Sequence, residues 1–183
     1  MRVHYHTFGC KANQYDTERM RQEAEARGER TTGSRSDADV VVVNTCTVTN
    51  QADAEARRFI RRVHRERPET RIVVAGCSAA LWEAAYRAMP GVVDVVPGHD
   101  PVRVASGISA GPRLAQLELR SGLERIDTEP IGGALLRRRA GASRGWLKVQ
   151  DGCDRKCSFC ATRLARGAYR CRPPDEVVAE AAR

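Results

Sequence analysis

The stretch "DVVVVNTC", residues 39–46, decides the fold. Its valines are β-branched and do not alternate with polar residues, which is typical of a strand buried on both faces of a parallel sheet. Two further segments have the same character and also end in a cysteine, namely "RVHYHTFGC" at residues 2–10 and "RIVVAGC" at residues 71–77. "VVDVV", residues 92–96, predicts a fourth strand.

A helical pattern follows each of the three cysteines. Glycine and proline mark where these helices stop, and Asn50 is the expected N-cap of the second. The helices are expected at Gln14–Arg27, Gln51–Arg67 and Ala79–Ala88. Alternating strands and helices imply right-handed crossovers and therefore a doubly wound parallel sheet of the α/β class. We expect this domain to cover residues 1–105.

The strand-end cysteines are Cys10, Cys46 and Cys77. Because the carboxyl ends of parallel strands lie at one edge of the sheet, where α/β proteins place their ligands, the three residues are expected to meet in space. A free cysteine is often only a small buried hydrophobe. Three of them in register at one edge favour a shared metal site over that alternative.

A second group of cysteines lies in "QDGCDRKCSFCATR", residues 150–163. Cys153, Cys157 and Cys160 follow the spacing C-x3-C-x2-C, whereas structural zinc sites and cubic iron–sulfur clusters usually have four protein ligands. Cys171 is the alternative fourth ligand of a closed zinc site, although C-x3-C is looser than typical zinc spacing. A strand at residues 146–150 is expected to lead into this loop, and a helix is expected at residues 173–183.

Residues 106–144 are rich in glycine and less regular, so we expect a connection between domains. It includes a hairpin around "RLAQLEL", residues 113–119, and an arginine run at residues 137–139 that is expected to be solvated.

The charge of the chain is unevenly distributed. The net charge is +8, of which residues 1–100 carry +1 and residues 101–183 carry +7. The basic half also holds the cysteine loop, and a basic surface suits a polyanion such as nucleic acid.

The sequence has no apolar run of 18 residues or more and no signal-peptide pattern, so we expect a cytoplasmic protein without a membrane segment. In a reducing compartment, seven cysteines indicate metal ligands or reactive thiols before disulfides.

The C-x3-C-x2-C loop closely resembles that of the radical-SAM enzymes. The resemblance implies that Cys153, Cys157 and Cys160 hold a [4Fe–4S] cluster with one iron open to S-adenosylmethionine (SAM). The reduced cluster then passes one electron to the sulfonium, and a 5′-deoxyadenosyl radical is released. Phe159 stands where the family has an aromatic residue beside the SAM adenine; ordinary core packing is the alternative. Cys171 lies where the family usually has serine, which favours a free thiol.

The segments "TFGCKANQYDTE", "VVVNTCTVTNQADAEARRFIRR" and "IVVAGCSA" resemble the N-terminal domain of the methylthiotransferases. The resemblance implies that Cys10, Cys46 and Cys77 bind an auxiliary [4Fe–4S] cluster. The residues around Cys10 and Cys46 look most like the branch that acts on threonylcarbamoyladenosine in transfer RNA. The alternatives are the branches acting on isopentenyladenosine in transfer RNA and on a ribosomal protein.

This resemblance implies a fold in which residues 145–183 begin a radical-SAM partial (β/α) barrel. It implies insertion of a methylthio group at carbon 2 of the modified adenosine, with transfer RNA, SAM and an electron donor such as a flavodoxin-type protein as partners. The family continues through a full barrel and a small RNA-binding β-domain, so the isolated 183-residue chain is expected to be inactive. A truncated, non-catalytic, metal-binding remnant is the rival interpretation.

Overall fold

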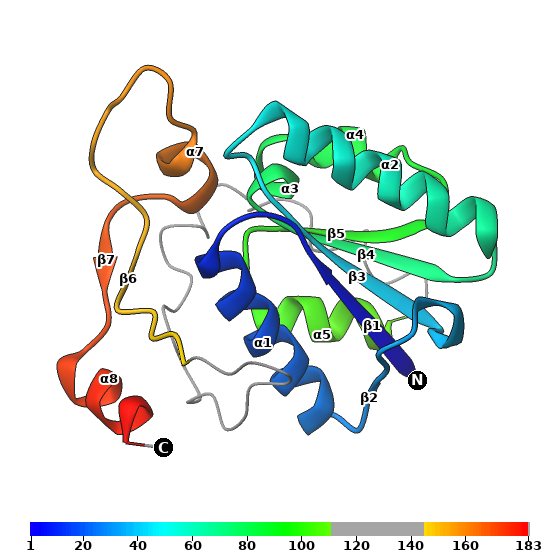
Figure 1. Ribbon diagram of the computed structural model, residues 1–183, viewed down its shortest axis with the longest axis horizontal. Coiled ribbons are helices and arrows are strands. Elements are labelled where there is room, and N and C mark those ends of the chain that lie inside the picture. Colours follow the sequence, from blue (N-terminus) through cyan, green and yellow to red (C-terminus); the bar gives the residue numbers. More distant parts are fainter. Residues whose placement is uncertain (111–144, 183) are drawn as a thin grey trace.

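The computed structural model describes residues 1–110 and 145–182. Five parallel strands form one sheet in the order β2-β1-β3-β4-β5, which confirms the predicted α/β class and doubly wound sheet (Figure 1). The strands are β1 (Arg2–Thr7), β2 (Arg30–Thr31), β3 (Val40–Thr45), β4 (Arg71–Gly76) and β5 (Val92–Pro97). The strand order reverses between β1 and β3, and such a switch point opens a crevice at the carboxyl ends of the strands.

Helices cover both faces of this sheet (Figure 1). One face carries α1 (Lys11–Ala26) and α5 (Pro101–Ser109), and the other carries α2 (Asn50–Glu66), α3 (Cys77–Leu81) and α4 (Glu83–Arg87). The valines of β3 alternate between two apolar cores, because successive side chains of a strand point to opposite faces. Val40 and Val42 pack toward α1 and α5, whereas Val41 and Val43 pack toward α2.

The helices differ from the predicted ones at several boundaries. Helix α1 begins three residues earlier, and the N-cap of α2 is Thr49, not Asn50, because the Thr49 side chain accepts a bond from the Ala52 amide. The third predicted helix is broken at Trp82 into α3 and α4. Helix α5 and strand β2 were not predicted. Helix α5 runs through the domain boundary expected at residue 105, and its Asp100 cap accepts bonds from the amides of Val102 and Arg103.

A small C-terminal part lies beside this α/β unit. It contains the antiparallel pair β6 (Gln150–Asp151) and β7 (Arg170–Cys171), and the helices α7 (Thr162–Arg166) and α8 (Pro174–Ala181). The strand predicted at residues 146–150 is wrong except at Gln150. Residues 146–149 instead pass along α1, where Lys148 bonds to Asp16. The predicted hairpin at residues 113–119 and the arginine run at residues 137–139 lie outside the described residues.

Short polar segments complete the described structure. A 3-10 helix (Arg35–Asp37) leads into β3. Among the described helices, none combines the length and the apolar character needed to cross a membrane.

Candidate functional site

The structure brings the three strand-end cysteines to one cavity. Cys10 follows β1 and is the N-cap of α1, Cys46 follows β3, and Cys77 is the first residue of α3 after β4. All three line a cavity of about 440 Å³ at the carboxyl edge of the sheet. The cavity lies at the switch point between β1 and β3, as the topology requires.

Two glycines allow the chain segments that carry the cysteines to pack closely against each other. Gly9 and Gly76 precede Cys10 and Cys77, and their φ angles are +98° and +100°. A Cβ atom on Gly9 would lie 2.4 Å from the Cys46 sulfur, and one on Gly76 would lie 2.3 Å from Asn44 Oδ1. A side chain at either position would therefore push apart the strand ends that carry the cysteines.

Asn13 sits in the middle of the group. Its Oδ1 lies 3.8 Å from the Cys77 sulfur and 4.0 Å from the Cys10 sulfur. Its Nδ2 donates to the carbonyls of Phe8 and Thr45, each at 2.9 Å. The side chain thus ties together the segments that follow β1 and β3. The Cys46 sulfur accepts a bond from the Val48 amide at 3.4 Å.

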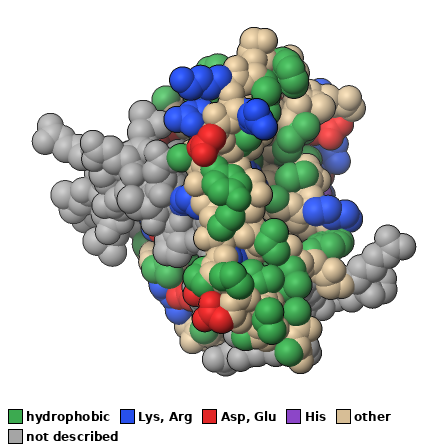
Figure 2. All heavy atoms as spheres, turned by 90° about the vertical axis from the view of Figure 1, so that its left-hand side faces the viewer, with side chains coloured by type: hydrophobic (Ala, Val, Ile, Leu, Met, Phe, Trp, Pro, Cys, Tyr) green, Lys and Arg blue, Asp and Glu red, His purple; other side chains and the backbone are tan. Residues whose placement is uncertain are grey.

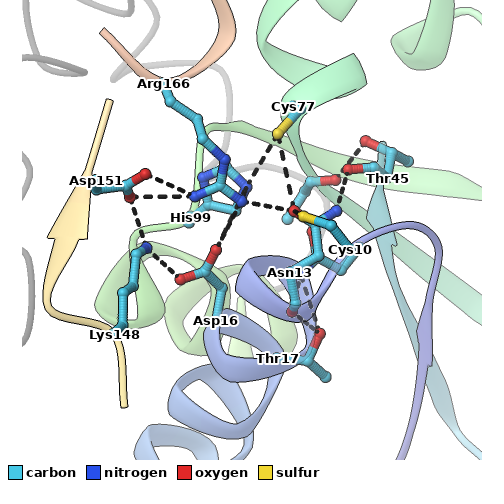
Figure 3. A network of polar contacts seen from close by, with 12 residues as sticks. Cys10, Asn13, Asp16, Thr17, Thr45, Cys77, His99, Lys148, Asp151 and Arg166 are labelled. Atoms are coloured by element: carbon cyan, nitrogen blue, oxygen red, sulfur yellow. Dashed lines mark hydrogen bonds and ion pairs between the residues drawn. The ribbon is translucent and has the colours of Figure 1, made fainter. Parts of the chain in front are cut away.

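A buried ion network from the C-terminal part closes one side of the cavity (Figure 3). Arg166 of α7 donates to Asn13 Oδ1 at 2.6 Å, to Asp16 at 3.0 Å and to Asp151 at 2.9 Å. Lys148 pairs with the same two carboxylates, at 2.6 Å from Asp16 and 2.5 Å from Asp151. Two carboxylates and two cations are thereby buried as a neutral group.

His99 completes this network. Its Nε2 lies 3.2 Å from Arg166 Nη2 and 3.6 Å from the Cys77 sulfur (Figure 3). Burial lowers the pKa of His99 to about 3, and the Arg166 charge acts in the same direction. The ring is therefore neutral at pH 7.

Burial and neighbouring charges act in opposite directions on the pKa values of Cys77 and Asp16. Burial raises the pKa of the Cys77 thiol to about 12, although Arg166 favours the thiolate. Burial also disfavours the charged form of Asp16, but the positive charges of Lys148 and Arg166 outweigh it and lower the pKa. A metal bound at Cys77 must displace a proton, because a thiolate is the ligand that metals take.

The second cysteine group is more open. Cys153 is half-buried, while Cys157 and Cys160 are exposed on the loop between β6 and α7. Phe159 is 91% exposed, so its ring is not packed into the core of the described residues. The Cys171 thiol on β7 donates to the Tyr169 hydroxyl at 2.7 Å.

The basic residues of the C-terminal part do not form one surface. Lys148, Arg166 and Arg172 are buried in ion pairs, which corrects the expectation that the positive charge beside the cysteine loop is exposed as a whole. Figure 2 shows apolar side chains spread over this face between scattered basic ones. The exposed basic residues here are Arg155, Lys156 and Arg163, and the exposed apolar ones include Phe159, Leu164, Tyr169 and Val178.

The donor set at the cavity fits an iron–sulfur cluster. Three thiols from three separate segments surround it, and thiolates are the ligands that such clusters take. Within residues 1–110 and 145–182, no three His, Cys, Asp or Glu side chains stand close enough to hold a single metal ion.

Comparison with known proteins agrees with this geometry. Residues 2–98 match the model of "Uncharacterized protein family UPF0004". The chain belongs to this family. The match covers the five strands of the sheet and all three strand-end cysteines, and it stops at Gly98, just before His99 and α5.

Curated relatives of this UPF0004 chain are methylthiotransferases. It is 35% identical to "Threonylcarbamoyladenosine tRNA methylthiotransferase MtaB" of Bacillus subtilis over 98% of the chain and 40% of that protein. It is 34% identical to "tRNA-2-methylthio-N(6)-dimethylallyladenosine synthase" of Sorangium cellulosum over 96% of the chain and 37% of that protein. It is 32% identical to "Ribosomal protein uS12 methylthiotransferase RimO" of Roseiflexus castenholzii over 99% and 42%. The chain thus spans about 40% of the length of these relatives.

Sequence reasoning missed the part that Asn13, Asp16 and His99 play in this site. It also missed that Arg166 is buried. His99 had a usable signal, because it follows β5 as the cysteines follow their strands. Asn13 and Asp16 lie on the first turns of the helix after Cys10, so they face the same edge. Arg166 had no such signal, since its partner Asp16 lies 150 residues away.

Proposed function

We propose that this chain forms the N-terminal part of a radical-SAM methylthiotransferase that acts on transfer RNA. The substrate is N6-threonylcarbamoyladenosine beside the anticodon, and the product carries a methylthio group at carbon 2. One observation carries the proposal. The three strand-end cysteines surround a cavity whose opposite wall comes from residues 146–152, Thr162 and Arg166, on either side of the C-x3-C-x2-C loop.

Each cysteine group has its own role in this proposal. Cys10, Cys46 and Cys77 hold an auxiliary [4Fe–4S] cluster, and Cys153, Cys157 and Cys160 hold a second one that leaves a coordination position for SAM. When bound, the clusters and SAM supply the methylthio sulfur, the methyl group and the radical. An electron donor such as a flavodoxin-type protein provides the electrons. The exposed Phe159 ring is free to pack against the SAM adenine.

The protein itself positions these groups. Gly9, Gly76 and Asn13 fix the strand-end thiols, and Arg166 fixes Asn13. The exposed cations Arg155, Lys156 and Arg163 suit phosphate groups of transfer RNA, whose neutralisation releases counterions. We also propose domain boundaries near residues 105 and 145. The proposed location of the protein is the cytoplasm.

The substrate assignment is tested by complementation. The full-length gene product is expressed in a strain that lacks its own methylthiotransferase, and the nucleosides of its transfer RNA are analysed by mass spectrometry. We expect threonylcarbamoyladenosine to gain a methylthio group. A gain on isopentenyladenosine would move the protein to another branch, and a modified ribosomal protein with unchanged transfer RNA would overturn the proposal. No modification at all would support the non-catalytic remnant.

The cluster assignment is tested by anaerobic reconstitution with iron and sulfide. Cys10→Ala should lose the iron and absorbance of one cluster and keep the other, and Cys157→Ala should show the reverse. Cys171→Ala is the matched control and should load both clusters. Unchanged iron content in Cys10→Ala would show that the strand-end cysteines do not share a cluster.

A further inference from the structure

The cavity between the two parts of the chain is lined by three cations that differ in their partners. Lys148 and Arg166 are each held by Asp16 and Asp151. Lys11 also lines the cavity, but within the described residues it forms no ion pair. Its Nζ instead lies 4.3 Å from the centre of the Trp146 ring.

Lys11 is an exposed residue at the N-terminus of a helix. It is the first residue of the sixteen-residue helix α1, whose first turn has no acidic side chain. A helix N-terminus favours anions over cations, because the helix dipole is positive there. The contact with the Trp146 ring offsets part of this disadvantage for Lys11. The Lys11 ammonium group lines the cavity and has no carboxylate partner among the described residues, so it is suited to bind an anionic ligand.

We propose that Lys11 recognises the threonyl carboxylate of the substrate and so selects threonylcarbamoyladenosine over adenosines with apolar N6 substituents. This inference rests on the proposed function. Carbon 2 and the N6 substituent of adenosine both flank ring nitrogen N1, on the same edge of the base. A base that presents carbon 2 to the strand-end cysteines therefore brings its N6 substituent to the same side of the cavity.

Lys11 lines the same cavity as the strand-end cysteines and follows Cys10 directly in the chain. The dimethylallyl group has no charge, and so it gains nothing from an ammonium group. The threonyl carboxylate gains a charge-assisted hydrogen bond. Trp146 is half-buried in the cavity wall and offers an aromatic face, on which a base can stack. The binding step transfers the Lys11 ammonium from this ring to the carboxylate.

The test measures binding, separately from catalysis, with the full-length gene product. Its affinity is determined for one transfer RNA that carries threonylcarbamoyladenosine and for the same transfer RNA with unmodified adenosine. We expect the wild-type protein to prefer the modified form, and Lys11→Met to lose about tenfold of that preference, as one charged hydrogen bond predicts. Lys11→Arg should keep most of it.

Two further measurements identify the group that Lys11 binds. Conversion of the threonyl carboxylate to its methyl ester should remove the same tenfold in the wild type and change nothing in Lys11→Met. Lys156→Met removes an exposed cation of the cysteine loop and should weaken binding of both transfer RNAs equally. SAM also carries a carboxylate, so its affinity is measured in each variant and should not change in Lys11→Met.

The outcomes separate this inference from the proposed function. If the wild type modifies threonylcarbamoyladenosine and prefers it, but Lys11→Met keeps the full preference, then the role of Lys11 is wrong and the function stands. If Lys11→Met weakens SAM binding and leaves the transfer RNA preference intact, the inference also fails. If the wild type neither prefers nor modifies threonylcarbamoyladenosine, the proposed function itself is overturned.

Discussion

The two groups of three cysteines are held by different kinds of structure. Cys10, Cys46 and Cys77 come from three strand ends, and the hydrogen-bonded sheet behind them fixes their spacing. Cys153, Cys157 and Cys160 share one loop of eight residues, in which the Cys160 amide bonds to the Cys157 carbonyl at 3.2 Å. The first group depends on the topology of the fold, and the second depends on local spacing.

This difference has consequences for stability. The strand-end site is built on a core in which the β3 valines are fully buried, so the sheet does not need a metal to form. The cysteine loop projects from the pair β6–β7 and is mostly exposed (Figure 1). The C-terminal part contacts α1 through one buried ion network and one buried hydrogen-bond cluster, and α7 also packs against α3.

Removal of Arg166 should have the largest effect. The substitution Arg166→Met leaves Asp16 and Asp151 buried with only Lys148 as a cation, and breaking a buried ion pair typically costs about 3–5 kcal/mol of the free energy of unfolding. Urea unfolding followed by circular dichroism measures the loss. The control is Arg163→Met on the same helix, whose side chain is 46% exposed and whose loss should stay within about 1 kcal/mol. Equal losses in both variants would show that the network does not join the two parts.

The substitution Gly9→Ala, next to Cys46, should cause the next largest loss in the free energy of unfolding. In Gly9→Ala, the new Cβ collides with the Cys46 sulfur and also adopts an unfavourable φ angle, so we expect a loss of about 2–4 kcal/mol. Gly28→Ala is the matched control, because its φ is +88° but no atom lies within 4 Å of the added Cβ. It should lose only about 1–2 kcal/mol.

The same pair of variants sharpens the comparison of the two cysteine groups. Displacement of Cys46 in Gly9→Ala should reduce the iron bound at the strand-end site and leave the loop cluster intact. Gly28→Ala should bind iron at both sites. A variant Gly9→Ala with normal stability and normal iron content would contradict the close approach of Gly9 to Cys46.

A smaller effect is expected when the pH is lowered, namely a change in the stability that the Asp16 ion pairs contribute. Asp16 faces Lys148, Arg166, His99 and Asp151, and their net effect lowers its pKa. A lowered pKa in the folded state means that the stabilisation is present above the pKa of an unfolded aspartate, about 3.9, and is lost as the pH falls through the folded value. The difference in stability between wild type and Arg166→Met should therefore shrink below about pH 4. A difference that stays constant down to pH 2 would show that the Asp16 charge contributes nothing.

The central strands β3 and β4 were predictable because they are buried on both faces and carry an apolar run. Helix α5 was missed because "PVRVASGIS" contains glycine and two serines, which are weak helix formers. It is helical because Asp100 caps it and because Val104 and Ile108 complete the core against β5 and α1. Tertiary contacts thus outweighed the local preference.

The candidate site shows the same division between local and distant information. The convergence of Cys10, Cys46 and Cys77 on one cavity followed from strand order, which the sequence pattern indicates. The burial of Arg166 did not follow, because an arginine beside a basic loop looks like a surface residue. Only the position of α7, which packs against α3 and places Arg166 beside Asp16, shows that its charge is neutralised.

The smallest effect should come from the second contact between the two parts. The buried Tyr15 of α1 donates to Glu180 of α8 at 3.0 Å and accepts from Arg172 at 3.2 Å. Tyr15→Phe removes both bonds but leaves the Arg172–Glu180 pair at 2.8 Å, so we expect a loss of about 1 kcal/mol. Amide hydrogen exchange should become about fivefold faster in α8 and stay unchanged in the sheet, because the loss affects local opening of α8. Tyr169→Phe, at an exposed tyrosine of the C-terminal part, is the control and should leave α8 unchanged. If α8 exchanges at the wild-type rate in Tyr15→Phe, then Arg172 and Glu180 alone anchor it, and the order of the C-terminal part depends less on α1 than its contacts indicate.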